Sequence, residues 1–311
     1  MSFSPNDIAY FLEVARHAHV GRAAQATGVT QPAVSKAIRR LEDAVGVPLF
    51  ERGAHGARLT SDGHLFLESA RRFDAQHADM VRSAAELRAQ HAGLLRVGVT
   101  NSAGDSPVVQ VLSEMVRRRP GLRLAMVIGR SDALNEAVDK GELDVAVVPS
   151  YPGISFSCSQ IELSEDTVRV AVRAEHPLAR RANPALGDLA EFGWVMPSRQ
   201  SAARRLATQI FERAGVAAPR VTLEADYTSE AVMGLLAGTD LLGLVPASVL
   251  RGWLGRVNAL PLPLPMLEMR RTLVLLTRPQ ANWSPLMTAF RDLLLLHRTP
   301  SPPMPMPTLR G

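Results

Sequence analysis

The sequence of 311 residues has a single cysteine and no apolar run long enough to cross a membrane. Because Cys158 stands alone, no intramolecular disulfide can form, which fits a reducing cytoplasm. Charge, Gly or Pro interrupts each apolar stretch well before the roughly 20 residues that a membrane span requires. The first residues lack a cationic start followed by an apolar run, so no secretory signal is expected. We therefore expect a cytoplasmic protein with no membrane partner, in which Cys158 is an ordinary half-buried thiol.

Signatures of catalysis and of metal binding are also missing. The sequence has no phosphate loop, dinucleotide fingerprint or hydrolase elbow, and its eight histidines do not follow metal-ligand spacing. We expect no catalytic residue, metal or cofactor, and we expect His17, His19 and His55 to be solvated or to face phosphate. The chain is 46% hydrophobic and 21% charged, with a net charge of +5. This composition predicts a globular chain of more than one domain and permits nucleic-acid binding without demonstrating it.

Residues 20–39 have the pattern of two short helices separated by a tight turn. Gly28 suits the end of the first helix, because glycine tolerates a positive φ. Thr30 stands where the N-cap of the second helix belongs, and Pro32 lies just inside that helix. An apolar stripe at i, i+4 and i+7 then follows, formed by Val34, Ile38 and Leu41. The pattern predicts a helix-turn-helix.

The other face of the second predicted helix is polar. It offers an amide, a hydroxyl and cations, from Gln31, Ser35, Lys36 and Arg39. A helix with such an outer face suits the major groove of DNA. The alternative is an ordinary surface helix of a globular domain.

The flanking residues favour the DNA-binding interpretation. Upstream, apolar residues at helical spacing predict a bracing helix and include Ile8, Phe11, Leu12 and Ala15. Downstream, Leu49 and Phe50 start a short strand, residues 53–56 form a turn, and residues 57–60 return. This hairpin is a wing, from which Arg52 and Arg58 can reach phosphate or the minor groove. Thr60 or Ser61 is expected to cap the next helix.

Residues 3–63 resemble the winged helix-turn-helix of LysR-type transcriptional regulators. The matching residues are Ala23-Ala24, Val29 to Ser35, Ile38 to Glu42, Gly46, Leu49 to Arg52, Leu59-Thr60 and Gly63. The sequence departs from the family at Thr27, where a leucine is usual, which affects packing between the two helices. The resemblance implies a DNA-binding domain over residues 1–62, and we expect its DNA contacts from Arg22, Thr30, Gln31, Pro32, Ser35, Lys36, Arg39, Arg52 and Arg58.

Residues 61 to about 91 predict one long helix, of which residues 63–91 form a linker. Apolar residues recur at alternating spacings of four and three, as in a coiled-coil seam. The seam residues expected to make a dimer are Phe66, Phe73, Met80 and Leu87, and His77 fills a slot as a packing residue. The alternative is a helix packed only on its own domain. In the LysR-type family this segment is the linker helix, and a dimer would present two recognition helices to two half-sites.

After a hinge at Ala92-Gly93, strands and helices alternate, which predicts a parallel sheet with right-handed crossovers. The chain leaves a first lobe, completes a second and returns. We expect lobe I over 92–161 and 268–298, and lobe II over 162–267. This path is similar to periplasmic-binding proteins of type 2 and to the LysR-type effector domain, here 92–298. The proline-rich residues 299–311 are expected to be disordered.

Polar residues follow the carboxyl ends of several predicted strands, where open α/β sheets bind ligands. The candidates for effector binding are Thr100, Asn101, Ser102, Pro149, Ser150, Ser198, Arg199, Thr228, Ser229, Val245 and Pro246. Hydroxyls and free N–H groups at helix starts suit a carboxylate, and Arg199 could pair with it. The alternative for each residue is a structural helix cap.

The sequence therefore predicts an α+β multidomain regulator of transcription, resembling the LysR type. A small anionic or aromatic effector between the lobes would alter the spacing of the DNA-binding heads. The expected partners are a two-fold site on double-stranded promoter DNA, a second copy in a dimer or tetramer, and RNA polymerase. The alternative is a small-molecule receptor or enzyme with an accessory helical domain, which lacks a catalytic constellation and an export signal.

Overall fold

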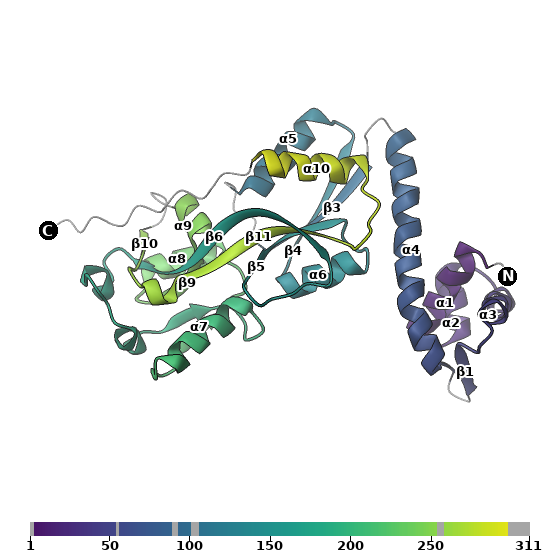
Figure 1. Cartoon of the computed structure of the whole chain (residues 1–311), viewed down its shortest axis with the longest axis horizontal. Helices are drawn as coiled ribbons and strands as arrows, with labels where there is room; N and C mark the ends of the chain where they lie inside the picture. Colours follow the sequence, from purple (N-terminus) through teal and green to yellow (C-terminus); the bar gives the residue numbers. More distant parts are fainter. Residues whose placement is uncertain (1–2, 54–55, 89–92, 101–105, 254–257, 298–311) are drawn as a thin grey trace. The chain divides into compact units, whose positions relative to one another are not determined.

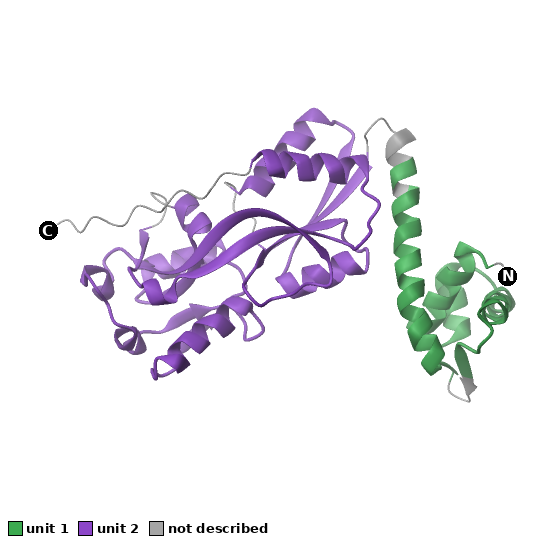
Figure 2. Ribbon diagram, in the orientation of Figure 1, with its two compact units in different colours: residues 1–88 green, residues 89–311 purple. Residues whose placement is uncertain are grey.

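The computed structural model describes residues 3–53, 56–88, 93–100, 106–253 and 258–297. The chain divides into two compact units, residues 1–88 and 89–311 (Figures 1 and 2). Within the described residues, no helix combines the length and the apolar character that a bilayer crossing demands. Asn101, Ser102, His55 and the tail 299–311, for which the sequence made predictions, lie outside the described residues.

Unit 1 is a small helical head followed by a hairpin and a long helix. Its elements are α1 (Pro5–His17), α2 (Val20–Thr27), α3 (Gln31–Val45), β1 (Phe50–Gly53), β2 (Gly56–Leu59) and α4 (Ser61–Arg88). Gly28 ends α2 with φ 70° and Gly46 ends α3 with φ 86°, as left-handed C-caps. Thr30 occupies the N-cap position of α3, but its side chain makes no capping hydrogen bond. The predicted winged helix-turn-helix is confirmed.

The head is built around Phe11. Its ring lies 5.2 Å from the rings of both Phe50 and Phe66, so α1, the hairpin and α4 share one core. The polar departure at Thr27 is satisfied locally, because its hydroxyl donates to the carbonyl of Ala23 at 2.8 Å. The wing is held against the α1–α2 turn by a hydrogen bond from the Ala57 N–H to the Ala18 carbonyl at 3.0 Å.

The long helix α4 buries the apolar residues near its start and exposes those further along. Thr60 caps the helix, because its hydroxyl accepts a hydrogen bond from the Gly63 N–H at 2.9 Å. Near its start, Ala70 is buried and Phe66 packs against the head core. Further along, Phe73 is 39% exposed and Met80 is 59% exposed. The side chain of Leu87 lies outside the described residues. A single copy of the chain therefore leaves Phe73 and Met80 of the predicted seam uncovered.

Unit 2 is a two-lobed α/β structure. The strands are β3 (Gly93–Val99), β4 (Leu122–Ile128), β5 (Val145–Ser150), β6 (Ser159–Arg173), β7 (Trp194–Met196), β8 (Val221–Glu224), β9 (Leu242–Pro246), β10 (Ala259–Pro261) and β11 (Met269–Thr277). The helices are α5 (Pro107–Arg118), α6 (Ser131–Asp139), α7 (Ala202–Arg213), α8 (Glu230–Gly238), α9 (Ala247–Trp253) and α10 (Pro285–Leu296), with short 3₁₀ turns at Pro177–Arg180, Leu186–Glu191 and Pro265–Leu267.

The strands follow the order β4-β3-β5-β11-β6-β9-β7-β8, with β10 also pairing to β6. Within lobe I, β3 runs parallel to β4 and β5, and within lobe II, β7 runs parallel to β8 and β9. The long strands β6 and β11 pair antiparallel and pass from one lobe to the other. This arrangement confirms the predicted fold class, with two crossing segments between two lobes.

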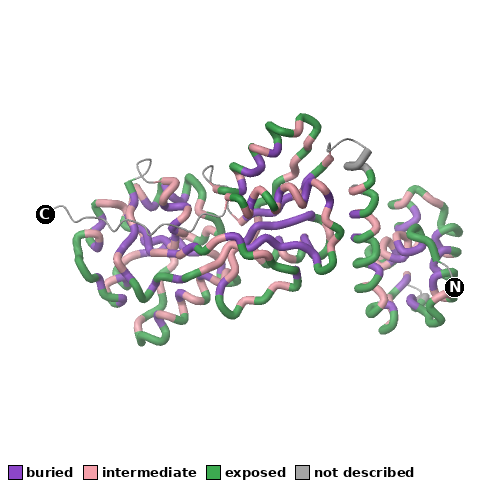
Figure 3. The backbone as a smooth tube through the Cα atoms, turned by 45° about the horizontal axis from the view of Figure 1, so that its top comes forward, coloured by how far each residue is buried: buried purple, intermediate pink, exposed green. Residues whose placement is uncertain are grey.

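Helices cover both faces of each lobe. In lobe I, residues of α5 and α10 share a core on one face of the sheet, and residues of α6 share a smaller core on the other. In lobe II, α7 packs on one face, while α8 and α9 pack on the opposite face. Figure 3 shows the buried strands running between the more exposed helices. The strand ends that meet between the lobes are therefore placed by two separate cores.

The environment of the Asp7 carboxylate makes the stability of unit 1 depend on pH. Its fully buried carboxylate accepts from the Ser4 N–H at 2.7 Å, from the Ser4 hydroxyl at 2.9 Å and from Arg40. Burial raises the pKa of Asp7, but these hydrogen bonds outweigh burial and hold the pKa below its usual value of 3.8. We expect Asp7→Asn to lower the free energy of unfolding at pH 7 by about 1–3 kcal/mol.

Because the pKa of Asp7 is lower in the folded state than in the unfolded state, ionised Asp7 stabilises the native state at pH values above the unfolded-state pKa. This stabilisation is lost as the pH falls through the folded-state pKa. The difference in the free energy of unfolding between wild type and Asp7→Asn should therefore disappear below about pH 4. Urea unfolding followed by far-UV circular dichroism measures this difference. Tryptophan fluorescence reports the unfolding of unit 2 separately, because all three tryptophans lie there. Glu13→Gln, which breaks surface pairs with Arg16 and His17, is the control and should change stability by less than about 0.5 kcal/mol for each pair. Equal unfolding midpoints for wild type and Asp7→Asn at pH 7 would contradict the prediction.

Candidate functional site

The recognition helix α3 separates its residues cleanly between core and solvent. Val34, Ala37, Ile38 and Leu41 are buried against the head core. On the opposite face the predicted DNA-contacting residues reach solvent, with Thr30, Gln31, Pro32, Lys36 and Arg39 exposed and Ser35 half-buried. Arg22 on α2 and Arg58 on β2 are also exposed, whereas the side chain of Arg52 lies outside the described residues. The folded head thus presents one amide, one hydroxyl and several cations on adjoining elements.

A cavity of about 230 Å³ lies between α3 and the wing. It is bordered by Gln31 and Ser35 from α3, by Gly56 from the wing and by His19 from the start of α2. Glu42 also borders this head cavity, but its carboxylate accepts from the Leu49 and Phe50 N–H groups at 2.8 and 3.1 Å. Two predicted base-reading residues therefore adjoin a hollow that a partner can enter.

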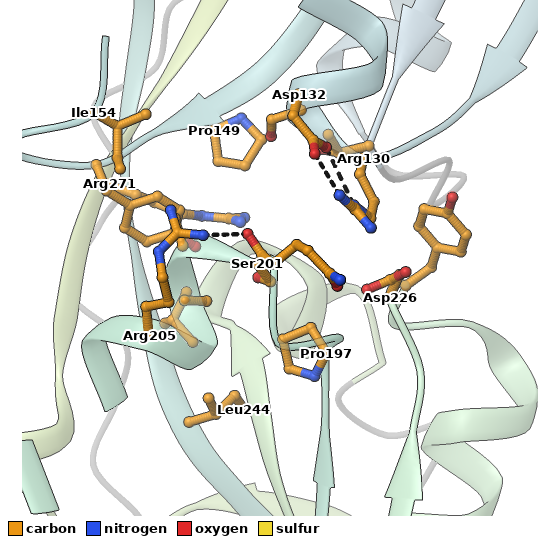
Figure 4. Close-up of a pocket in the computed structure, with 18 of the residues that line it drawn as sticks. Arg130, Asp132, Pro149, Ile154, Pro197, Ser201, Arg205, Asp226, Leu244 and Arg271 are labelled. Atoms are coloured by element: carbon orange, nitrogen blue, oxygen red, sulfur yellow. Dashed lines mark hydrogen bonds and ion pairs between the residues drawn. The ribbon is translucent and has the colours of Figure 1, made fainter. Parts of the chain in front are cut away.

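A second hollow, the interlobe pocket of unit 2, has a volume of about 300 Å³ (Figure 4). Lobe I contributes Thr100, Pro149 and the start of α6, and lobe II contributes Pro197, Thr228, Pro246 and the start of α7. Val168 of β6 and Arg271 of β11, on the two crossing strands, also line the pocket. Four predicted effector-binding residues are thus brought together here: Thr100, Pro149, Thr228 and Pro246.

The remaining described candidates lie elsewhere, and strand geometry explains two of them. Leu244 and Pro246 line the pocket, so Val245 between them points to the other face of β9, where it is 1% exposed. Ser150 likewise lies between Pro149 and Tyr151, which both line the pocket. The prediction is wrong for Val245, because its side chain is enclosed in the core.

The other three candidates have different surroundings. Ser229 is an ordinary N-cap, since its hydroxyl accepts from the Val232 N–H at 3.3 Å. Ser198 is buried, and its backbone N–H donates to Asp226 at 2.9 Å. Arg199 is exposed and lies outside the residues that line the interlobe pocket. For Ser229 the structural alternative of a helix cap is the observed role.

The charged groups of the pocket come mostly from residues that the sequence interpretation missed. Arg271 donates to Asp166 at 2.6 and 3.0 Å, and Asp166 also accepts from the Ser248 hydroxyl at 2.7 Å. Burial raises the pKa of Asp166, but the charge of Arg271 and the bond from Ser248 outweigh it and lower the pKa. Asp166 and Arg271 therefore both remain ionised, and their opposite charges neutralise each other.

Arg130 and Arg205 approach the pocket from opposite lobes. Arg130 is paired with Asp132, and the hydrogen bond between them holds the pKa of that carboxyl below its usual value. Arg205 donates to the Gln200 carbonyl and, among the residues that the structure describes, has no carboxylate partner. Arg205 is therefore a cation available to an anionic ligand.

Two helix starts face the pocket, and at both of them the N-cap residue itself provides no side-chain cap. Ser201 stands at the N-cap of α7 and Arg130 at the N-cap of α6, and neither side chain accepts a capping hydrogen bond. By contrast, Ser229 and Ser284 cap α8 and α10. First-turn N–H groups of a helix bind anions well. Apolar rings and branches also line the pocket, from Tyr151, Ile154, Leu244 and the three prolines. The arrangement suits a small anion with an apolar body.

Comparison with known proteins assigns both units. Residues 5–64 match the bacterial regulatory helix-turn-helix proteins of the lysR family, and residues 88–298 match the LysR substrate binding domain. The chain belongs to the LysR family. It is a LysR-type DNA-binding transcriptional regulator with an effector-binding domain.

Individual relatives support this assignment over most of the chain. The LysR-type chain is 30% identical to the SDS degradation transcriptional activation protein of a Pseudomonas species, covering 94% of this chain and 96% of that protein. It is also 30% identical to the regulator GbpR of Azospirillum brasilense, over 69% of this chain and 63% of that protein. The crystal structure of full-length CbnR complexed with its target DNA shares the fold, with a TM-score of 0.57 at 19% identity, covering 94% of this chain and 99% of that chain.

The lone thiol of this LysR-type regulator is chemically protected. Cys158 is buried, and its Sγ–H donates to the Asn135 carbonyl at 3.4 Å. Burial and the charge of Asp139 raise the pKa of the thiol to about 11. Burial and the raised pKa both disfavour the thiolate, which is the reactive form of cysteine. Among the described residues no group of three or more His, Cys, Asp or Glu is placed to hold a metal ion.

We expect Cys158 to react slowly with a disulfide reagent at pH 8, because the folded thiol stays protonated until pH approaches about 11. Denaturation in guanidinium should release one rapidly reacting thiol per chain, and this is the control. Cys158→Ser should retain DNA affinity with and without prior peroxide treatment. Rapid labelling of the native protein would show that the thiol is accessible and ionised.

Proposed function

We propose that this LysR-type regulator responds to a small carboxylate with an apolar or aromatic body, bound in the interlobe pocket. The observation that carries the proposal is the pair of uncapped helix starts on opposite walls, with Arg205 beside one of them. A carboxylate can accept charge-assisted hydrogen bonds from the Arg205 guanidinium and hydrogen bonds from first-turn N–H groups of the helices. The apolar lining would take the rest of the ligand.

The bound ligand would act by joining the lobes. The start of α6 belongs to lobe I and the start of α7 belongs to lobe II, so an anion held by both favours one relative position of the lobes. A ligand shifts such an equilibrium only by its difference in affinity for the two states. We infer that the change in lobe closure is passed to the DNA-binding heads through the assembly.

We propose that α3 reads base edges with Gln31, Ser35 and Lys36, and that Thr30 and Pro32 lie close to them. The cations Arg22, Arg39, Arg52 and Arg58 would hold phosphates or the minor groove. Two copies would pair through α4, because Phe73 and Met80 would lose the surface that a single copy leaves exposed. This gives part of the roughly 1.5–3 kcal/mol that complete burial of such a side chain contributes. Such a pair presents two recognition helices to a two-fold promoter site in the cytoplasm, where RNA polymerase also acts.

The recognition face is tested with Lys36→Ala and Ser35→Ala. Loss of a base-edge contact should weaken binding to the specific site by roughly 1–3 kcal/mol and leave the mass of the assembly unchanged. Fluorescence anisotropy with a duplex selected by the protein from a random pool measures the loss. Lys140→Ala is a matched control, because Lys140 is the other lysine of the chain and lies exposed at the end of α6. Full affinity in both α3 variants would refute the assignment of the contacts.

The pocket is tested with Arg205→Gln and Thr100→Val in the full chain. A panel of aromatic and aliphatic carboxylates, each with its uncharged amide, is screened by thermal shift, since a ligand stabilises the native state by mass action. Carboxylates should raise the midpoint where amides do not, and Arg205→Gln should lose roughly tenfold in affinity. Arg213→Gln, an exposed arginine on the same helix, is the control. Equal shifts from acids and amides would contradict the anionic assignment.

A further inference from the structure

Helix α2 of the head begins with an unusual capping group. His19 occupies the N-cap position in extended conformation, with φ −157° and ψ 120°. Its Nδ1 accepts from the Gly21 N–H at 3.0 Å and from the Arg22 N–H at 3.4 Å. Serine, threonine, asparagine and aspartate are the usual capping residues, and they act through a side-chain oxygen. An imidazole caps with one nitrogen and has a second nitrogen left over.

The cap fixes the tautomer of His19. Because Nδ1 must keep its lone pair to accept the two N–H groups, the ring proton belongs on Nε2. Nε2 is then a donor with no capacity to accept. The side chain is exposed, and within the described residues no acceptor is bonded to Nε2. The head therefore carries a pre-oriented, uncharged N–H donor at its surface.

This donor lies beside the recognition helix. His19, Gln31 and Ser35 border the head cavity together. A Cβ at Gly21 would lie 3.1 Å from the His19 ring and 3.6 Å from the Gln31 side-chain oxygen, so both groups border the small space that glycine leaves open. The imidazole is thus placed next to the first residue of α3 by its own cap and by the absence of a side chain at Gly21.

The position of α2 decides what the donor meets. When a recognition helix lies in the major groove, the preceding helix of a helix-turn-helix crosses the sugar–phosphate backbone. The start of α2, next to Gln31, then faces the phosphates that form the wall of the groove. Glu42, the carboxylate that borders the same cavity, is already bonded to two backbone N–H groups.

We propose that His19 binds a DNA phosphodiester through its Nε2–H as a neutral donor, while its Nδ1 caps α2. This inference rests on the assignment of α3 as the recognition helix. Arg22 lies three residues further along, on the same edge of the first turn, and binds phosphate as a cation. The two residues therefore make phosphate contacts of different electrostatic kinds from one helix turn.

The difference can be measured, because only a cation releases a counterion when it meets phosphate. Each neutralised phosphate contributes about −0.9 to the slope of log affinity against log salt. Loss of Arg22 should reduce the magnitude of that slope by about 1 for each head that binds. Loss of the His19 donor should lower affinity at every salt concentration and leave the slope unchanged.

The experiment compares full-length wild type, His19→Asn, His19→Ser and Arg22→Gln. Asparagine and serine retain an oxygen that caps α2, so both variants should keep the thermal midpoint and the dimer mass of wild type. Binding is measured at pH 8 between 50 and 200 mM KCl, on a duplex selected from a random pool and on an unrelated duplex of equal length. We expect both His19 variants to lose roughly tenfold on both duplexes with an unchanged slope.

Three results would overturn the inference. Wild-type affinity in both His19 variants would show that Nε2 makes no contact. A slope reduced as in Arg22→Gln would show that the imidazole binds as a cation. A loss confined to the selected duplex would place the donor on a base edge. Lys36→Ala tests the recognition face separately, so its failure is distinguishable from each of these results.

Discussion

The pairing of β6 with β11 is the constraint on which the effector unit depends. These strands carry the chain between the lobes, and their register sets Asp166 opposite Arg271. The resulting ion pair is buried and also binds Ser248 at the start of α9. Leaving either charge without its partner would be strongly destabilising, so register and ion pair reinforce each other. Because Arg271 also lines the interlobe pocket, the wall that meets a ligand is part of the connection between the lobes.

In the head, too, buried or bonded carboxylates hold separate elements together. Asp7 joins the start of α1 to Arg40 on α3, and Glu42 joins the end of α3 to the first strand of the wing. Glu42 borders the head cavity beside Gln31 and Ser35, but its carboxylate is already bonded to backbone N–H groups of the wing, while Lys36 and Arg39 remain exposed. Stability and recognition are thus carried by different residues of the same helix, which lets a LysR-type regulator change its binding site without rebuilding its core.

Much of the regulator could be predicted from the sequence, because its signals are local. The alternation of Val34, Ile38 and Leu41 with polar residues requires only helical periodicity, and Gly28 and Gly46 mark helix ends through their tolerance of positive φ. The strand–helix alternation after Gly93 likewise predicted parallel sheets, since crossovers between adjacent parallel strands need an intervening helix. Local signals do not show whether a polar residue at the start of a helix caps that helix or binds a ligand.

The helices and strands, their apolar and polar faces, and the family could all be predicted from the amino-acid sequence. The grouping of strand-end residues in one pocket follows instead from the packing of the two lobes. Pro246 reaches the interlobe pocket and Val245 does not, because neighbouring side chains of β9 point to opposite faces and one of those faces is filled by α8 and α9. Arg130, Arg205 and Arg271 meet there from three distant segments, and no local pattern encodes such a meeting, since it depends on how two separately packed lobes are joined.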